Sequence, residues 1–396
     1  MTKTFHVRKI SKTDLFNTIK EVGFDSSYIN KAINKYKFNR YLICDLTPQQ
    51  ATIIKQTALS LGADSAVHRE VITCKVDKSN VLIGCTDTQL ERIADKLKLQ
   101  PFKLKQVADE LLTVKNNQLI PLVVRNRVFN WSAKTYIMGI LNVTPDSFSD
   151  GGKFFGLEEA LKQAELMINS GVDIIDIGGE STRPFSEEVP PDEELKRILP
   201  VIKKLREKYP EIIISVDTRH SHTAIECVQN GADIINDVSG FDKDPQMMET
   251  VKNLDVPIII MHSQGSPETM QNNPEYSENI ITSIYKTLSD KVNNAISCGI
   301  KKENLIIDPG VGFGKTQEHN IEIIRRIEEF TSLGLPILVG ISRKSVIANI
   351  LNSQDRDDAT IALNSYLAQN GANIIRVHKV PAHSKAFKVL DVVIKN

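Results

Sequence analysis

The stretch YIMGILNVTPDSFSDGG, Tyr136 to Gly152, begins as an apolar run and ends as a polar loop. The run Ile137 to Val143 is typical of a buried strand, and at Asn142 it breaks into a segment dense in Pro, Asp, Ser and Gly. These residues favour turns, because their side chains bond nearby backbone and Gly tolerates positive φ. A helical pattern follows from about Leu157. A polar, Gly-rich loop after a buried strand is where α/β proteins place their ligands.

The same unit recurs along the rest of the chain. Short β-branched runs alternate with amphipathic helical segments, the last two of which are predicted at 344–369 and 382–393. The predicted strands are Tyr136–Val143, Asp173–Ile177, Ile212–Asp217, Asp233–Asp237, Pro257–His262, Leu305–Asp308, Pro336–Ile341 and Asn373–His378. Strands that alternate with helices pair in parallel, and eight such units in about 260 residues predict an α/β fold, a (β/α)8 TIM barrel. A doubly wound open sheet is the alternative.

The first 130 residues show a different pattern. Strand-like runs and amphipathic helical runs alternate there, and predict a small α/β or α+β domain. The strand-like runs are Tyr41–Cys44, Val71–Val76 and Asn80–Gly84, and the helical runs are Pro48–Leu61, Thr88–Lys98 and Phe102–Leu112. We therefore expect two domains, a small N-terminal one at 1–130 and a catalytic barrel at 134–396. The role of the first is open.

Composition excludes several classes of protein. Lys and Arg number 49, as do Asp and Glu, so the chain lacks the basic excess of a nucleic-acid binder. No apolar run reaches the ~18–20 residues of a membrane span, and the first residues hold no apolar signal segment. The five cysteines are widely spaced without a CxxC pair, which indicates free thiols in a reducing cytoplasm rather than a zinc site. We therefore expect a cytoplasmic protein without nucleic-acid or membrane partners.

Polar or ionisable residues stand at the end of almost every predicted strand. They are Asn142, Asp176, Asp217, Asn236, His262, Asp308, Lys344, Arg376 and His378. In a barrel these strand ends meet on one face, the catalytic one. Each residue alone has a plainer explanation, since an Asp, Asn or Thr after a strand often caps the next helix. For Thr218 and Asp237 capping and function are equally open, but the joint pattern favours a ligand site.

Two chemical classes dominate these strand ends. Asp217, Asn236 and Asp308 present acceptors that suit a flat heterocycle with N–H donors. Cationic side chains follow other strands, and Arg suits phosphate, which barrels commonly bind after strands 7 and 8. The cations are Arg183, Arg343, Lys344, Arg376 and His378. The side chains alone predict a donor-rich ring at one end of the site and a phosphate or pyrophosphate at the other.

The segment DPGVGFGKT, Asp308 to Thr316, resembles a phosphate-binding P-loop but departs from it at one position. The first glycine of a Walker A motif would fall at 309, which is Pro309. The segment is better explained as a Gly-rich turn that brings Phe313 and the backbone close to a ligand. GGESTRP likewise lacks the second glycine of a nucleophile elbow, so Ser181 is not expected to be a hydrolase nucleophile. Any metal would be a hard ion held mainly by substrate phosphates.

Eight segments in order, ILNVTPDSFSDGG, DIGGESTRP, SVDT, INDVSG, MHSQGSPETMQ, DPGVGFGKT, GISRKS and RVH, resemble the dihydropteroate synthase family over residues 136–394. The resemblance implies a pterin-binding TIM barrel. It implies a transferase of folate biosynthesis that condenses 6-hydroxymethyl-7,8-dihydropterin pyrophosphate with p-aminobenzoate and releases pyrophosphate. It also implies Mg²⁺ as a cofactor and a target for sulfonamides.

The resemblance also implies a role for particular residues. Positions that match those holding the pterin are Asp217, Asn236, Asp308 and Lys344. Asn142 matches the contact to magnesium and pyrophosphate, Arg376 and His378 match the anion pocket, Thr182 and Arg183 lie in the second mobile loop, and Phe313 and Ser345 match the p-aminobenzoate side. The implied catalytic residues are Asp217, Lys344, Arg376 and His378. A homodimer is left open.

Three departures and two rival functions remain, and one departure, Ser263 in MHSQG, is expected to be a tolerated surface change. Lys379 follows His378 where the family usually has Asp, which puts the anion pocket in question. The leading residues lie outside the compact enzyme and suit an oligomerisation or partner-binding module. One rival is a methyltetrahydrofolate:corrinoid methyltransferase, which needs the pterin carboxylates but no pyrophosphate pocket. The other is a degenerate homologue that binds pterin without catalysis.

Overall fold

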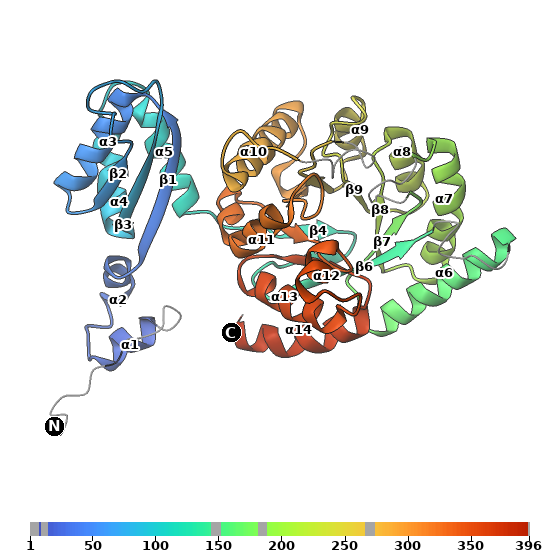
Figure 1. The fold of residues 1–396 in the computed structure, drawn as a ribbon. Coiled ribbons are helices and arrows are strands. Elements are labelled where there is room, and N and C mark those ends of the chain that lie inside the picture. Colours follow the sequence, from blue (N-terminus) through green and yellow to red (C-terminus); the bar gives the residue numbers. More distant parts are fainter. Residues whose placement is uncertain (1–7, 9–14, 144–151, 181–187, 266–273, 395–396) are drawn as a thin grey trace. The chain divides into compact units, whose positions relative to one another are not determined.

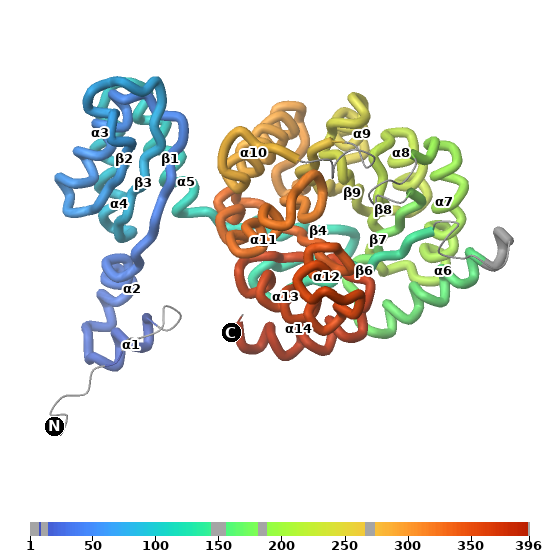
Figure 2. The backbone as a smooth tube through the Cα atoms, viewed as in Figure 1, coloured from blue at the N-terminus to red at the C-terminus, as the bar shows by residue number. Residues whose placement is uncertain are grey.

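The computed structural model of the 396-residue chain describes residues 8, 15–143, 152–180, 188–265 and 274–394 (Figures 1 and 2). Internal contacts divide it into two compact units, Met1–Asn117 and Gln118–Asn396, called here the N-terminal unit and the barrel unit. The division comes before the predicted boundary of 1–130 and 134–396. The difference is a short hairpin that packs with the barrel, described below.

Eight parallel strands form the sheet of the barrel unit, in the order β11-β10-β9-β8-β7-β6-β13-β12. Their bounds are β6 Tyr136–Asn142, β7 Ile174–Gly178, β8 Ile213–Asp217, β9 Ile234–Asp237, β10 Ile258–Met261, β11 Leu305–Asp308, β12 Leu338–Val339 and β13 Ile374–Val377. A parallel bridge between Ile307 and Ile337 joins β11 to the segment entering β12. The sheet therefore closes, and the predicted (β/α)8 barrel is confirmed over the open-sheet alternative.

Helices surround these strands in chain order (Figure 1). They are α6 Gly152–Asn169, α7 Pro191–Lys208, α8 Ser221–Gln229, α9 Met247–Leu254, α10 Ile280–Cys298, α11 Gln317–Arg325, α12 Ser345–Leu351, α13 Asp357–Gln369 and α14 Val380–Ile394. Short 3-10 helices cover Lys302–Asn304 and Ile327–Leu333. No helix in the described parts of the chain is long and apolar enough to cross a membrane.

The prediction of one helix over 344–369 is wrong, because the segment is split into α12 and α13. Asn352 follows α12 with a left-handed φ of 48°, a conformation that Asn tolerates and that ends a helix. The irregular link that follows lets Arg356 donate to the carbonyl oxygen of Lys344 at 3.1 Å. The break therefore ties the start of α13 to the loop that carries Lys344.

Strand residues alternate between the helices and the barrel interior. Ile175 and Ile177 of β7 belong to the core shared with the helices, whereas Ile174 points into the barrel. The interior residues of this first layer are Met138, Ile174, Ile213, Ile234, Ile259, Ile306, Leu338 and Ile374. Two positions further along, several strands carry a polar interior residue, such as Asp176 after Ile174 and Arg376 after Ile374. The polar site therefore rests on an apolar floor.

A two-stranded hairpin covers the other side of this apolar layer. It consists of β4 Leu122–Val124 and β5 Arg127–Phe129 and packs, with Trp131, in the same hydrophobic cluster as the barrel interior. Arg127 also pairs with the buried carboxylate of Asp173, which precedes β7. The hairpin thus belongs with the barrel by apolar burial and by charge, and this places the unit boundary before it.

The N-terminal unit holds α1 Leu15–Glu21, α2 Ile29–Ala32, β1 Phe38–Leu46, α3 Pro48–Ser60, β2 Asp64–Val67, β3 Ser79–Thr86, α4 Asp87–Leu97 and α5 Leu104–Lys115, with a 3-10 turn at Ile33–Lys35. Its antiparallel sheet has the order β1-β3-β2, and α3, α4 and α5 share one core with it. The predicted α/β domain is confirmed. The predicted strand Val71–Val76 is wrong, because Cys74 has a left-handed φ of 53° and the segment is a run of turns.

Candidate active site

Three predicted site residues meet through a fourth, Asp176. Arg376 of β13 donates from Nε to Asp176 Oδ2 at 2.6 Å and from Nη2 to Asp217 Oδ2 at 2.7 Å. Asn236 of β9 donates from Nδ2 to the same Asp176 oxygen at 3.1 Å. The carboxylates come from the neighbouring strands β7 and β8, whose parallel register brings these strand ends together. One connected polar layer therefore spans four strands.

The charges in this layer are mutually dependent. Burial raises the pKa of Asp217, Arg376 lowers it, and the nearby carboxylate of Asp176 raises it again. Burial lowers the pKa of Arg376, but Asp176 and Asp217 more than offset this and the net shift is upward. Arg376 therefore stays a cation between two carboxylates. Such a group can stabilise an incoming anion while it keeps its own position.

Asp308 and Lys344 form the second part of the site. Asp308 is buried at the end of β11, where its Oδ1 accepts from the Gly310 N–H at 2.7 Å. Burial raises its pKa, and the charge of Lys344 acts against this. Lys344 Nζ donates to the Val311 carbonyl oxygen and lies 4.5 Å from the Phe313 ring centroid. Burial lowers the pKa of Lys344 to about 8, with Asp308 opposing.

Of the two residues predicted for the anion pocket, Arg376 lies in β13 and His378 follows the end of that strand. Ser342 Oγ lies 3.0 Å from His378 Nδ1 and accepts from the His378 backbone N–H at 3.3 Å. Lys379, the departure from the family pattern, pairs with Asp357 at the start of α13. Arg343, which the sequence grouped with the cations, is exposed and adopts a left-handed φ of 60°. Its backbone turn serves to place Lys344.

The remaining predicted residues fall into two groups. Asn142 ends β6 opposite Gly178 of β7 and is half-buried, and Ser345 is the exposed first residue of α12. Thr182 and Arg183 lie outside the described residues, as does most of the loop that follows Asn142. Asn142 thus lies at a strand end and Ser345 at a helix start, and the roles of all four residues stay predictions.

Asp237 and Thr218, whose roles the sequence left open, accept hydrogen bonds from backbone N–H groups of the loops that follow them. Asp237 accepts from the N–H groups of Ser239 at 2.8 Å and Phe241 at 2.7 Å, and so builds the turn after β9. Thr218 Oγ1 accepts from the His220 N–H at 3.2 Å. Both side chains therefore organise the loops that follow their strands, but neither caps a helix, because the N-cap of α8 is His220 and that of α9 is Gln246.

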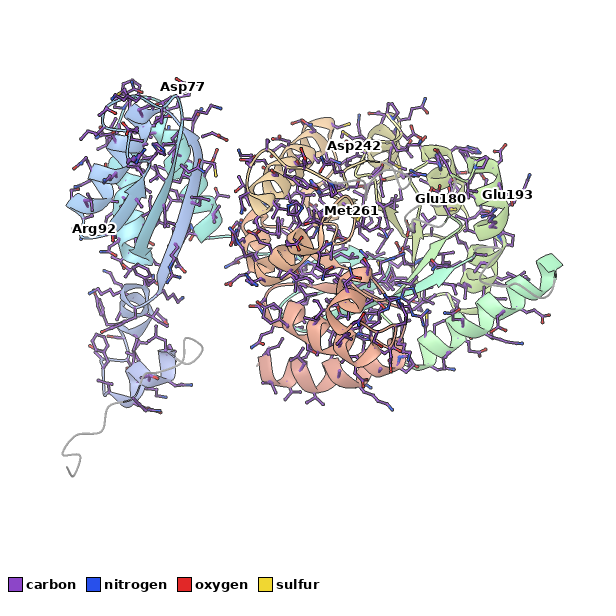
Figure 3. The ribbon with its side chains drawn as sticks, viewed as in Figure 1. Asp77, Arg92, Glu180, Glu193, Asp242 and Met261 are labelled. Atoms are coloured by element: carbon purple, nitrogen blue, oxygen red, sulfur yellow. The ribbon has the colours of Figure 1, made fainter. Side chains whose placement is uncertain are left out.

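Several buried charged groups were not assigned a role from the sequence. Thr218 Oγ1 donates to Glu194 at 2.8 Å, and burial raises the pKa of that carboxyl to about 7. Glu180 accepts from Arg219 at 2.7 Å (Figure 3 labels Glu180). Lys315 is fully buried behind the Gly-rich turn. Glu194 and Lys315 give no sequence signal, because a charged residue in a helix or loop is usually solvated.

The donor set suits a weakly coordinated hard cation. The described residues contain no group of three or more His, Cys, Asp or Glu side chains placed to hold a metal. Asn142 offers an amide oxygen, which is a ligand that Mg²⁺ accepts. A Mg²⁺ at this position would take its other ligands from substrate phosphate and water, which is the usual coordination of that ion in phosphate sites.

Comparisons with known proteins agree with this geometry. Residues 138–378 match the family described as "Pterin binding enzyme". The dihydropteroate synthase of Synechocystis is 44% identical over 274 residues, which cover 68% of this chain and 94% of that protein. A probable bifunctional folylpolyglutamate synthase/dihydropteroate synthase of Haloferax volcanii is 37% identical over 365 residues, 89% of this chain and 43% of that longer protein.

Solved structures give the same result for the barrel unit. A dihydropteroate synthase from Clostridium difficile, determined in the presence of pteroic acid, has a TM-score of 0.64 at 44% identity and covers 68% of this chain and 100% of its own. The Yersinia pestis dihydropteroate synthase in a sulfonamide drug complex has a TM-score of 0.65 at 38% identity and covers 69% of this chain and 99% of its own. The chain therefore belongs to the pterin binding enzyme family, among the dihydropteroate synthases.

Proposed function

We propose that this chain condenses 6-hydroxymethyl-7,8-dihydropterin pyrophosphate with p-aminobenzoate to form 7,8-dihydropteroate and pyrophosphate. The observation that carries the proposal is the buried layer in which Arg376 bonds Asp176 and Asp217, and Asn236 bonds Asp176. This layer offers acceptors for a flat donor-rich ring and a cation for the leaving group at one place.

The pterin would lie on the acceptors of the strand ends. Asp217, Asn236 and Asp308 face the barrel interior, so a ring with amino and N–H donors satisfies groups that are costly to bury without partners. Lys344 stands beside Asp308 and supplies a donor for a ring acceptor. The apolar floor below this layer excludes water from the ring.

Departure of pyrophosphate would use the cations at β12 and β13. Arg376 bonds two carboxylates and His378 contacts Ser342, so both would meet the developing negative charge without reorganisation. Asn142 would hold a Mg²⁺ ion, which when bound would supply further charge stabilisation for the leaving oxygens. The chain's own part is to fix these donors before the bond breaks.

Attack by p-aminobenzoate would then follow at a cationic methylene carbon. Asp217 lies within the layer that holds the pterin and offsets this positive charge over a short distance. The arylamine is neutral and nucleophilic at neutral pH, so the step requires no strong base. Phe313 and Ser345 line the side from which it approaches, and the amine loses its proton to solvent after the C–N bond forms.

Release of pyrophosphate tests the proposal directly. The purified chain is mixed with dihydropterin pyrophosphate, Mg²⁺ and p-aminobenzoate, and pyrophosphate and dihydropteroate are quantified together by chromatography. We expect equal amounts of both products, and neither when p-aminobenzoate is omitted. Methyl transfer from methyltetrahydrofolate to a corrinoid protein, without pyrophosphate release, would establish the methyltransferase instead. Pterin binding without turnover would establish a degenerate homologue.

Three further properties belong to the same proposal. A sulfonamide should inhibit by competing with p-aminobenzoate, since the Yersinia pestis relative was determined in such a complex. Inhibition that a rising concentration of p-aminobenzoate does not relieve would contradict this.

A homodimer is proposed as the assembly, and a molar mass of one chain measured by light scattering would contradict it. A cytoplasmic location is proposed from the free cysteines.

A further inference from the structure

Lys315 is the residue that the comparison with a Walker A motif left without a role. It ends the Gly-rich turn after β11, and only 1% of it is exposed. Its ammonium group has three partners: the Phe313 carbonyl oxygen at 2.9 Å, His262 Nδ1 at 3.0 Å and the His262 carbonyl oxygen at 3.2 Å. These match the three donors of an ammonium group, so none is left to point at a phosphate.

The surroundings of Lys315 are unusual for a lysine. Among the described residues its hydrogen-bond partners include no carboxylate. Burial lowers its pKa well below the ordinary value, with Asp308 acting in the opposite direction. Burial, with Lys315 as the second cause, also lowers the pKa of His262 to about 2, so the imidazole is neutral and can accept. An amino group buried among neutral acceptors is costly unless its hydrogen bonds are made, so the three contacts fix the position of Lys315.

The Gly-rich turn lies directly against the loop after β10. A Cβ added to Gly310 would lie 1.9 Å from the His262 carbonyl oxygen, and one added to Gly314 would lie 2.3 Å from that of Gln264. Tyr276 reaches across to donate to the Gly314 carbonyl oxygen at 2.8 Å. Backbone is therefore packed on backbone here, and Lys315 joins the two loops through a carbonyl of each.

Phe313 is held from two sides by this arrangement. Its carbonyl oxygen accepts from Lys315, and its ring lies 4.5 Å below the ammonium group of Lys344. We propose that Lys315 is a positioning residue that sets the Phe313 wall of the subsite for the arylamine substrate. The inference rests on the proposed function. It assigns to Lys315 an effect on the affinity for p-aminobenzoate. The binding of the pterin is assigned to Asp217, Asn236, Asp308 and Lys344.

The test is whether a substitution of Lys315 changes the KM for p-aminobenzoate without changing the KM for dihydropterin pyrophosphate. Lys315→Met removes all three hydrogen bonds at nearly constant volume. We expect the KM for p-aminobenzoate to rise about tenfold or more, because a displacement of about 1 Å is costly in a site of this kind. The KM for dihydropterin pyrophosphate should change by less than about twofold, and kcat at saturating p-aminobenzoate by less than about threefold.

Lys291→Met is the matched control. Lys291 is another buried lysine of the barrel, in α10, and it holds the carbonyl oxygen of Ser239 and the carboxylate of Asp242 in the loop after β9. We expect it to lower the melting temperature while both Michaelis constants stay within about twofold. An equal rise in the KM for p-aminobenzoate in both variants would show general loosening and overturn the assignment.

A double-mutant cycle keeps the proposal testable if Lys315→Met does not fold. Lys315→Gln retains donors of shorter reach, and it is combined with Phe313→Leu. If Lys315 acts through Phe313, the double variant has the same KM for p-aminobenzoate as Phe313→Leu alone. If the rise in this KM in the double variant equals the product of the rises in the two single variants, the residues act independently and the proposal is overturned. If the wild-type chain releases no pyrophosphate, both the proposed function and this inference are wrong. If the wild type is active and Lys315→Gln leaves the KM for p-aminobenzoate unchanged, only this inference is wrong.

Discussion

Asp217 is buried and accepts a hydrogen bond from Arg376. Burial raises the pKa of its carboxyl group, and Arg376 opposes this shift. Asp217→Asn keeps the shape of the side chain and removes the charge that faces the cationic methylene. We predict a fall in kcat of at least about 100-fold, in the range that follows loss of one electrostatic stabiliser. Pyrophosphate release measures it, and circular dichroism should show an unchanged fold.

Asp255→Asn is the control for this substitution. Asp255 is half-exposed, pairs with Lys301 after α9, and has a left-handed φ of 50° that Asn adopts readily. Its turnover should match that of the wild type. Wild-type turnover in Asp217→Asn would remove the role assigned to that carboxylate.

Lys344 gives the site a pH dependence. Its pKa is lowered to about 8, so the ammonium form is complete well below pH 8 and is lost as pH rises through that value. We predict that kcat/KM for dihydropterin pyrophosphate falls on the alkaline side with an apparent pKa near 8, since kcat/KM follows the ionisation of the free enzyme. Phosphorus NMR of the released pyrophosphate measures this without coupling enzymes.

Lys344→Arg separates this ionisation from others. A guanidinium keeps its charge throughout the accessible pH range, so the alkaline fall should disappear even if the overall rate is lower. A fall near pH 8 that persists in Lys344→Arg would assign the ionisation to another group.

At the scale of elements, the Gly-rich turn after β11 is limited by the space around its backbone. Gly310 has a φ of 70° and no room for a Cβ, because the His262 carbonyl oxygen occupies that place. We predict that Gly310→Ala abolishes measurable activity and lowers the melting temperature, since backbone has to move to accept the methyl group. Steady-state assay and thermal unfolding measure the two effects.

Gly171→Ala tests whether the effect is steric. Gly171 also has a positive φ, of 83°, but its nearest neighbour is the Ser384 hydroxyl at an ordinary 3.5 Å. Only the left-handed strain of about 1–2 kcal/mol applies there, and activity should be retained. Equal losses in both variants would contradict the packing argument for Gly310.

The β4–β5 hairpin acts as a cover for the apolar end of the barrel. Phe129 is fully buried and lies 4.7 Å from the Tyr136 ring and 5.8 Å from the Trp131 ring, measured between centroids. We predict that Phe129→Ala lowers the free energy of unfolding by about 3–5 kcal/mol. Trp131 is the only tryptophan of the chain, so its fluorescence in urea follows the barrel alone.

The hairpin itself supplies the control for this prediction. Val123 is 62% exposed on β4, and Val123→Ala should change the free energy of unfolding by no more than about 0.5 kcal/mol. The folded Phe129→Ala variant should keep its turnover at low temperature, because the substitution lies at the end of the barrel away from the polar layer. A loss of turnover without a loss of stability would contradict the separation of the two ends.

At the scale of the whole molecule, the neutral charge is the sum of two opposite ones. Residues 1–117 hold 19 Lys and Arg against 12 Asp and Glu, whereas residues 118–396 hold 30 against 37. The composition of the full chain therefore describes neither unit. The net charge of the full chain was the reason for excluding a nucleic-acid partner. That reason applies to the barrel unit but not to the basic N-terminal unit.

Truncation tests the division into units. We predict that residues 118–396 fold alone and retain kcat/KM within about twofold, since the barrel unit contains its own core and the whole polar layer. A chain of residues 131–396 should fail to fold, because removal of the hairpin exposes the apolar interior of the barrel. Solubility, circular dichroism and pyrophosphate release measure both. An active 131–396 chain would show that the hairpin is dispensable.

Much of the barrel follows from local sequence patterns. Parallel strands buried on both faces appear as continuous apolar runs, and glycines mark the helix ends before them, so the eight units are visible one at a time. The predicted strand Val71–Val76 fails because it has the composition of a strand but contains Cys74, whose left-handed backbone no composition shows. The predicted helix 344–369 fails for the same reason at Asn352. Single backbone angles of this kind are set by the surrounding packing.

The sequence by itself determined the barrel, its family, and the polar residues at the strand ends, because these depend on periodicity and on the order of short motifs. Only the tertiary structure decided how those residues pair. Asp176 became the centre of the polar layer, and Lys315 turned inward to His262 rather than outward to a phosphate. The reason is that the free energy of a buried charge depends on neighbours from distant strands. Those neighbours are brought within hydrogen-bond distance only when the barrel closes.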